Sequence, residues 1–197
     1  MQTAGIAMLH LSTMNPYVIS TARLGLRQWT DADIQPFAEM NADAAVMRYF
    51  PAILTPEETS GMIKRIRQGF ETNGFGFYAV ELQSTKEFIG FTGFSIPRFE
   101  SFFTPCIEIG WRYKQSAWGN GYATEAASAC LQYGFAVLGL PTVYSFTAAI
   151  NLPSEKVMQR IGMAKVGEFN HPNIAEDNAL CRHVVYQVDA PIAPTKQ

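Results

Sequence analysis

Two glycines separated by one residue, Gly119 and Gly121, stand between a predicted strand and a predicted long helix. An apolar run at residues 106–113 indicates the strand, and apolar residues that recur every three or four positions from Tyr122 indicate the helix. Glycine lets the backbone approach a ligand closely, and the first N–H groups of a helix have no partner within the helix. The turn therefore predicts a phosphate or pyrophosphate site. The alternative is a tight turn that needs glycine only for a positive φ.

The rest of the chain mixes strand and helix patterns. Strand patterns occupy residues 24–26, 77–82, 88–96, 106–113, 142–148, 165–169 and 181–188. Helix patterns occupy the segment after Asp33 and residues 42–49, 56–73, 122–137 and 151–161. Hairpins give antiparallel pairs, and the long helix connects two parallel strands. We expect an α+β layered domain, with a mixed, mostly antiparallel central sheet of about seven strands and helices on both faces.

The ends of the chain set the expected domain boundaries. Residues 1–20 and 191–197 have the composition of loose ends, so we expect an N-terminal extension, one domain over residues 21–190 and a C-terminal tail. Three cysteines, odd in number and widely spaced, predict reduced core thiols. We find no signal-peptide pattern and no apolar stretch long enough for a membrane span, so the expected location is cytoplasmic, without a membrane partner.

Composition and motifs disfavour several classes of function. The 15 Lys and Arg against 17 Asp and Glu leave a formal charge of −2 and no basic run, so nucleic acid is not an expected partner. The three histidines and three cysteines form no HExxH or CxxC spacing, so no metal is expected. A dinucleotide-binding fold is disfavoured because Thr124 stands where a third glycine would stand. A Walker-type nucleotide site is disfavoured because the chain has no GxxxxGK(S/T) motif.

A second motif, Asn151-x-x-Ser154, begins the helix that follows the strand at 142–148. The two side chains are three residues apart and share a helix face. The Ser154 hydroxyl lies at the edge of the predicted buried stripe. In the alternative interpretation, Asn151 is an ordinary N-cap and Ser154 only occupies the first turn.

Taken in order, these blocks resemble the GNAT superfamily of acetyl-CoA-dependent N-acetyltransferases, and within it the RimJ/RimL-like branch. The blocks that support the resemblance are IEIGW at 107–111, WGNGYATEA at 118–126, Asn151-x-x-Ser154 and RIGM at 160–163. The similarity in element order extends from residue 21 to residue 188. The resemblance implies a GNAT-like fold whose central strands splay apart, with the pantetheine arm of acetyl-CoA in the gap.

The resemblance also implies roles for individual residues. The implied cofactor-binding residues are Ile109, Gly110, Trp111, Trp118, Gly119, Asn120, Gly121, Tyr122, Ala123 and Asn151. Ser154 would protonate the departing thiolate, and Glu108 matches the glutamate that some members use, directly or through water, as the base. The alternative for Glu108 is a strand acid paired with Arg or Lys, and His171 and His183 are rival bases.

The implied reaction moves an acetyl group to a primary amine, either a small amine or a protein or peptide N-terminus, by direct attack in a ternary complex formed by a monomer or homodimer. We expect the acceptor pocket near the first two helices and near Phe50, Phe75, Phe99, Phe102, Phe103 and His171. Lys156 and Arg160 lie either near the cofactor's ribose phosphate or on a solvated face. Two alternatives remain: an acyl-CoA-binding module without catalysis, and a nucleotide- or dinucleotide-dependent enzyme that uses the glycine turn.

Overall fold

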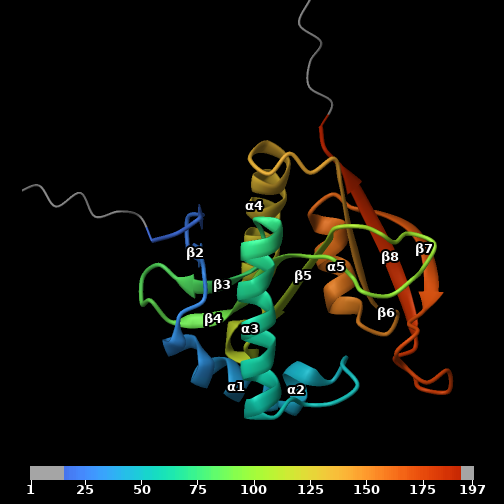
Figure 1. The fold of residues 1–197 in the computed structure, drawn as a ribbon, viewed down its shortest axis with the longest axis horizontal. Helices are drawn as coiled ribbons and strands as arrows, with labels where there is room; N and C mark the ends of the chain where they lie inside the picture. Colours follow the sequence, from blue (N-terminus) through green and yellow to red (C-terminus); the bar gives the residue numbers. More distant parts are fainter. Residues whose placement is uncertain (1–15, 192–197) are drawn as a thin grey trace, which may run out of the picture.

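A computed structural model describes residues 16–191 and contains one central sheet of eight strands, in the order β1-β2-β3-β4-β5-β6-β8-β7 (Figure 1). The strands are β1 Ile19–Ser20, β2 Leu24–Arg27, β3 Phe77–Leu82, β4 Phe88–Ser95, β5 Glu108–Tyr113, β6 Thr142–Ala148, β7 Ala164–Asn170 and β8 Arg182–Asp189. All neighbours are antiparallel except β5 and β6. The predicted mixed sheet is confirmed. The strand beyond the expected seven is β1, whose two residues are too few to show an alternating pattern.

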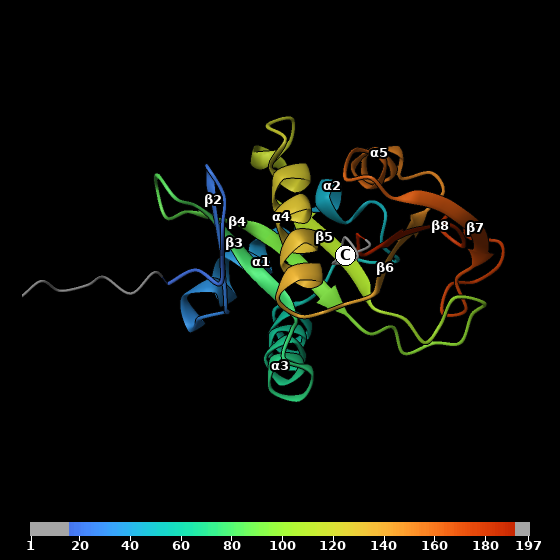
Figure 2. The same cartoon turned by 90° about the horizontal axis from the view of Figure 1, so that it is seen from above.

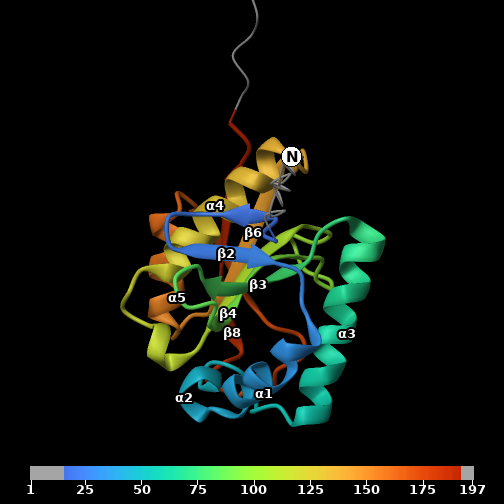
Figure 3. The same ribbon diagram turned by 90° about the vertical axis from the view of Figure 1, so that its left-hand side faces the viewer.

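Helices cover both faces of the sheet, as predicted. They are α1 Ile34–Ala42, α2 Ala44–Met47, α3 Pro56–Asn73, α4 Tyr122–Ala136 and α5 Leu152–Arg160, with short 3-10 turns at Asp31–Asp33 and Gln115–Ala117. The first three helices share a hydrophobic core that includes Phe37, Ile63 and Phe91, whereas α4 and α5 contribute to the larger core on the other face. Figures 2 and 3 show α3 and α4 on opposite sides of the sheet.

The limits of α3 follow from its terminal residues. Thr55 and Glu58 form a capping box, in which the Thr55 hydroxyl accepts from the Glu58 N–H at 3.2 Å and the Glu58 carboxylate accepts from the Thr55 N–H at 2.8 Å. Gly74, with φ of 77°, ends the helix. The helix predicted over 56–73 is therefore confirmed.

Three local predictions needed correction. The strand predicted at 106–113 begins at Glu108. The helix predicted at 42–49 is only Ala44–Met47, because the Asp43 side chain accepts from the Ala45 N–H and caps a new helix. Val137, which the pattern placed on the apolar stripe of the long helix, follows α4 and is 66% exposed.

The ends of the chain and its cysteines complete the description. The predicted extension (1–20) and tail (191–197) fall largely outside the described residues. Within residues 16–191, no helix has the length and apolar character needed to cross a membrane. The cysteines are unpaired thiols; Cys130 and Cys181 are buried, and Cys106 is only partly buried.

The central strands β5 and β6 separate soon after they meet. Their pairing is confined to Glu108 with Tyr144, where the Tyr144 N–H donates to the Ile107 carbonyl at 2.9 Å. By contrast, β4 pairs with β5 along the whole of Glu108–Tyr113. The predicted splay of the central strands is thus present, and it opens the sheet at its middle.

Candidate active site

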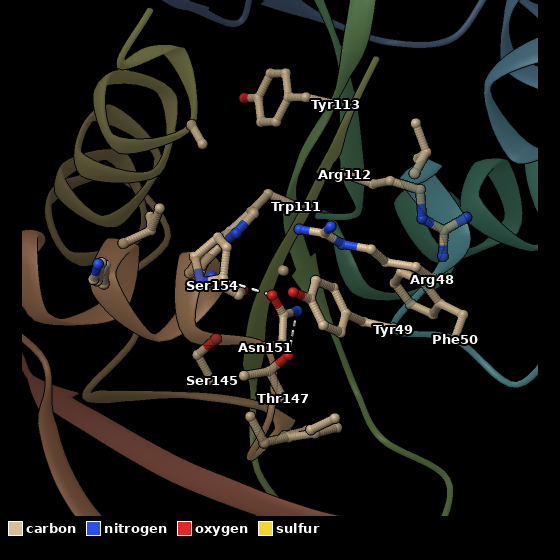
Figure 4. A pocket seen from close by; sticks show the side chains of 18 of the residues that line it. Arg48, Tyr49, Phe50, Trp111, Arg112, Tyr113, Ser145, Thr147, Asn151 and Ser154 are labelled. Atoms are coloured by element: carbon tan, nitrogen blue, oxygen red, sulfur yellow. Dashed lines mark hydrogen bonds between the residues drawn. The ribbon is translucent and has the colours of Figure 1, made fainter. Parts of the chain in front are cut away.

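A cavity of about 1110 Å³ lies where β5 and β6 diverge. Its walls come from β5, the turn before α4, β6, the start of α5, and α2 with the residues that follow it (Figure 4). Segments far apart in the chain therefore meet at one opening in the sheet.

The turn before α4 presents backbone donors to this cavity. Gly119 and Gly121 both have φ of 78°, and we call residues 118–121 the glycine loop. Within the described part of the chain, no acceptor is found for the six consecutive N–H groups from Gly119 to Thr124. Because the first N–H groups of a helix point along its axis and carry a partial positive charge, this end of the cavity suits an anion such as a pyrophosphate.

Strand β5 offers one further backbone donor in the gap. The Lys114 N–H donates to the Ile89 carbonyl of β4, and Gly110 lies opposite Gly93. Because bonding direction alternates along an antiparallel strand, the backbone groups of Gly110 face β4 and those of Trp111 face β6. At Trp111 the two central strands no longer pair, so its N–H points into the gap.

Two carbonyls beside Trp111 are already satisfied. The Ser145 hydroxyl of β6 donates to the Ile109 carbonyl at 2.9 Å, at the point where the strands separate. The Trp118 indole N–H donates to the Tyr113 carbonyl at 3.0 Å and fixes the glycine loop to the end of β5. These bonds hold the two walls of the gap in place.

At the start of α5, Asn151 caps the helix and Ser154 faces the cavity. The Asn151 side-chain oxygen accepts from the Ser154 N–H at 3.3 Å, and its amide donates to the Thr147 hydroxyl at 2.9 Å (Figure 4). The Ser154 hydroxyl has no hydrogen-bond partner among the described residues, and the side chain is half-buried. Ser154 therefore has a proton to donate to a ligand.

Glu108 is a carboxyl group without a cationic partner in the part of the chain that is described. Its Oε2 accepts from the Ser95 hydroxyl at 3.0 Å. Protein surrounds the group, although the cavity gives solvent partial access to it, and burial raises the pKa of Glu108 to about 7. Among residues 16–191, no Arg or Lys forms the ion pair with Glu108 that the alternative interpretation requires. A carboxyl with this pKa can accept a proton near neutral pH.

Two histidines also line the cavity, with ring centroids 5.0 Å apart. His183 Nδ1 lies 3.1 Å from the Cys181 carbonyl, which can only accept, so we assign the proton of the neutral ring to Nδ1. Burial lowers the pKa of both His171 and His183. Both are neutral at pH 7 and remain rival proton acceptors to Glu108.

The structure brings most of the predicted site residues together. Those that line the cavity are Glu108, Gly110, Trp111, Trp118, Gly119, Gly121, Tyr122, Ala123, Asn151 and Ser154. Ile109 instead lies in the core, and the Asn120 side chain folds back to the carbonyls of Ala117 and Trp118. No group of His, Cys, Asp and Glu suited to a metal ion is found among residues 16–191.

The acceptor-pocket prediction is only partly right. Phe50 and His171 line the cavity, whereas Phe75, Phe99, Phe102 and Phe103 do not. The difference arises because Phe99 and Phe103 pack against Phe169 in a separate aromatic cluster.

The cavity residues that sequence reasoning missed include Arg48, Tyr49 and Arg112. Arg112 is buried; its Nη1 donates to the Asn41 side-chain oxygen at 2.6 Å, and the Phe50 ring lies 4.0 Å from its guanidinium carbon. Burial lowers the pKa of Arg112 to about 10, so it is still a cation at pH 7. One signal in the sequence could have identified Arg112. It lies four residues after Glu108, so both charged side chains are on the same face of a strand that is otherwise mostly apolar.

Comparisons with known proteins agree with this geometry. The family model for the acetyltransferase (GNAT) domain matches residues 23–164. The uncharacterized N-acetyltransferase YnaD of Bacillus subtilis is 32% identical over 152 residues, which cover 77% of this chain and 85% of YnaD.

Solved acetyltransferase structures share the fold of this chain. A GNAT-family acetyltransferase from Bacillus anthracis superposes with a TM-score of 0.73 at 28% identity, over 87% of this chain and 98% of that one. The spermidine N-acetyltransferase of Vibrio cholerae, in complex with CoA and spermine, has a TM-score of 0.69 at 17% identity, over 86% and 97% of the two chains, and shares the fold.

Proposed function

Because the chain belongs to the GNAT family of acetyltransferases, which use acetyl-CoA, we propose that it transfers the acetyl group to a primary amine by direct attack within a ternary complex. The main support is the run of N–H groups from Gly119 to Thr124, which have no acceptor within residues 16–191, beside the open gap between β5 and β6. A diphosphate and an extended arm need those two features side by side.

We assign the cofactor contacts on the same geometry. The N–H groups of the glycine loop and the first turn of α4 bind the pyrophosphate, and the arm lies along β5 beside Trp111 and Asn151. Lys156 and Arg160 line the cavity from the exposed side of α5 and serve the ribose phosphate.

The reaction then needs three groups of the protein. Glu108 takes the proton of the amine, directly or through water, as the N–C bond forms. The Trp111 N–H donates to the carbonyl oxygen as it becomes negative. When the C–S bond breaks, the thiolate receives the Ser154 hydroxyl proton. Each group lines the same cavity, so all three are available to one substrate complex.

The sequence blocks support two finer assignments. We place the chain in the RimJ/RimL-like branch, which favours a protein or peptide N-terminus or a small amine as acceptor. We also propose that residues 21–190 form one catalytic domain, acting in the cytoplasm as a monomer or homodimer.

Thermal unfolding with added ligands tests the cofactor assignment. A ligand at 100 times its Kd stabilises the folded state by about 2.7 kcal/mol, which for a chain of this size raises Tm by roughly 5–10 °C. We expect that shift with acetyl-CoA and with CoA, and no shift with NAD or ATP. A shift with NAD or ATP alone would contradict the proposal, and CoA binding without thiol release for any amine would indicate a non-catalytic binding module.

A further inference from the structure

The cavity has an excess of positive charge. The charged side chains that line it are Arg48, Glu108, Arg112, Lys156 and Arg160. None of the five takes part in an ion pair within residues 16–191. The whole chain has a formal charge of −2, so four unpaired cations around a single carboxyl are a local property of this cavity.

These cations divide between two walls. Lys156 and Arg160 belong to α5, on the wall that contains Ser154. Arg48 and Arg112 lie on the opposite wall. The Arg48 side chain extends toward Trp111, with its guanidinium carbon 5.8 Å from the centroid of the Trp118 ring, and Arg112 lies beside Phe50 (Figure 4). The proposed function assigns Lys156 and Arg160 to a phosphate of the cofactor, which leaves Arg48 and Arg112 without an assigned anion.

The Arg112 guanidinium has hydrogen-bond donors without a partner in the described structure. Among the fully buried side-chain nitrogen and oxygen atoms of the described residues, only Arg112 Nε has no hydrogen-bond partner. Its Nη2 also has no hydrogen-bond partner among the described residues and is not among the fully buried atoms, and Arg112 is one of the residues that line the cavity. A buried cation without a counter-ion is costly, and a bound carboxylate or phosphate would remove most of that cost.

We propose that the amine acceptor carries an anionic group, a carboxylate or a phosphate, which Arg112 and Arg48 bind while the amine faces Glu108. This inference rests on the proposed function. Glu108 and Arg112 share one face of β5 and are four residues apart, about 13 Å along the strand. The anion and the reacting amine therefore bind at separate points of one wall.

The same charges disfavour a polycation. A polyamine brings several positive charges, and the cavity offers one carboxyl against four cations. Unpaired like charges at close range are repulsive, most strongly where water is excluded. We therefore expect acceptors with a single amine and an anion to bind better than polyamines.

Titration calorimetry on the protein saturated with CoA measures acceptor binding without turnover. Matched pairs supply the probes: glycine and glycinamide, 4-aminobutanoate and 4-aminobutanamide, phosphoethanolamine and ethanolamine, and Ala-Asp-Gly amide and Ala-Asn-Gly amide. The first two pairs test a small carboxylate, the third a phosphate and the fourth an acidic peptide. We expect at least one anionic member to bind at least about tenfold more tightly than its neutral partner, with the same preference in kcat/KM with acetyl-CoA.

Three variants tie this preference to the arginines. Arg112→Met and Arg48→Met should each reduce the preference by at least about fivefold, whereas Arg65→Met, at an exposed arginine of α3 outside the cavity, should keep it. The exposed Arg48 position keeps the test usable if Arg112→Met fails to fold, which thermal unfolding would reveal.

The outcomes separate the two proposals. Equal binding within every pair, tighter binding of spermidine, or a preference unchanged in Arg48→Met and in a folded Arg112→Met would overturn the anionic acceptor and leave the acetyltransferase assignment intact. Failure of CoA itself to bind would overturn the proposed function, and the inference with it.

Discussion

The two ends of the cavity are built in different ways. At the proposed cofactor end, a single stretch from Gly119 to Thr124 offers backbone N–H donors, and no side chain of residues 16–191 caps α4. At the acceptor end, α2, β5 and the histidines near β8 contribute side chains from positions more than 100 residues apart in the chain. A backbone site depends on local conformation, whereas a side-chain site depends on how the whole domain packs.

This difference extends to charge. In the proposed function, the glycine loop binds the cofactor through peptide dipoles, which do not titrate. The acceptor end depends on Glu108, whose pKa burial raises to about 7, and on a desolvated Arg112. Backbone geometry should therefore control the affinity for cofactor, and protonation should control the rate.

Gly121→Val is the most severe test of the backbone end. Gly121 has φ of 78°, a conformation that a β-branched residue adopts only with strain, and the new side chain would disturb the N–H groups around it. We expect the Kd for acetyl-CoA to rise by at least about 100-fold, measured by titration calorimetry, while the circular dichroism of the folded protein stays unchanged.

Gly139→Val is the matched control for that variant. Gly139 also has positive φ, at 67°, it follows α4, and a Cβ there would meet nothing within 4 Å. The strain is similar, but the position lies outside the cavity. If both variants weakened cofactor binding equally, or if Gly121→Val left it unchanged, the glycine loop would not be the pyrophosphate site.

The local nature of the glycine loop explains why its position between β5 and α4 could be predicted from the sequence. The strand, the two glycines and the helix start are contiguous, so spacing alone placed Gly119, Gly121 and Tyr122 together. The Asn151 and Ser154 pair was equally visible, although the cap that Asn151 forms and the contact that Ser154 makes with the cavity could not be separated without the fold.

The acceptor end could not be predicted in the same way. The spacing of Arg112 and Glu108 marks one polar face of β5 in the sequence, but only the fold shows that Arg112 lies beside Asn41 and Phe50, far away in sequence, and lines the cavity. Phe99 and Phe103 looked like pocket residues because they are aromatic, but they pack on Phe169. Side-chain partners in such a site come from tertiary packing, which a single sequence does not record.

Glu108→Gln tests the side-chain end and should lower kcat/KM on the order of 100-fold. The wild-type rate should rise with pH through about 7, where the Glu108 carboxyl loses its proton, and the variant should lack that rise. Initial rates of thiol release between pH 5.5 and 9 measure both effects. A wild-type profile in the variant would assign the base to His171 or His183.

The same variant makes a prediction about stability. Burial raises the Glu108 pKa from 4.5 to about 7, so between these values the folded protein holds a proton that the unfolded chain has lost, and stability falls as pH rises through this range. The amide introduced by Glu108→Gln has no proton to lose, so the variant should not become less stable as the pH rises through this range. Above pH 7.5, we expect its free energy of unfolding, measured in urea, to exceed that of the wild type by about 1–3 kcal/mol. Glu100→Gln, at an exposed position, should change neither stability nor rate.

Ser154→Ala should give the smallest effect, because a thiolate leaves readily even without a proton donor. We expect kcat to fall by about tenfold and the Kd for acetyl-CoA to stay within about twofold, since the variant keeps the Ser154 N–H that Asn151 caps. Single-turnover rates and calorimetry separate the two quantities.

Ser154 combines the two kinds of construction in one residue. Its N–H belongs to the helix cap, a local feature, whereas its hydroxyl has no partner among the residues that the structure describes and lines the cavity. Ser128→Ala, at a half-buried serine of α4 away from the cavity, should leave kcat unchanged. If Ser154→Ala behaved like this control, Ser154 would be a residue of the cap alone, and water would supply the proton to the thiolate.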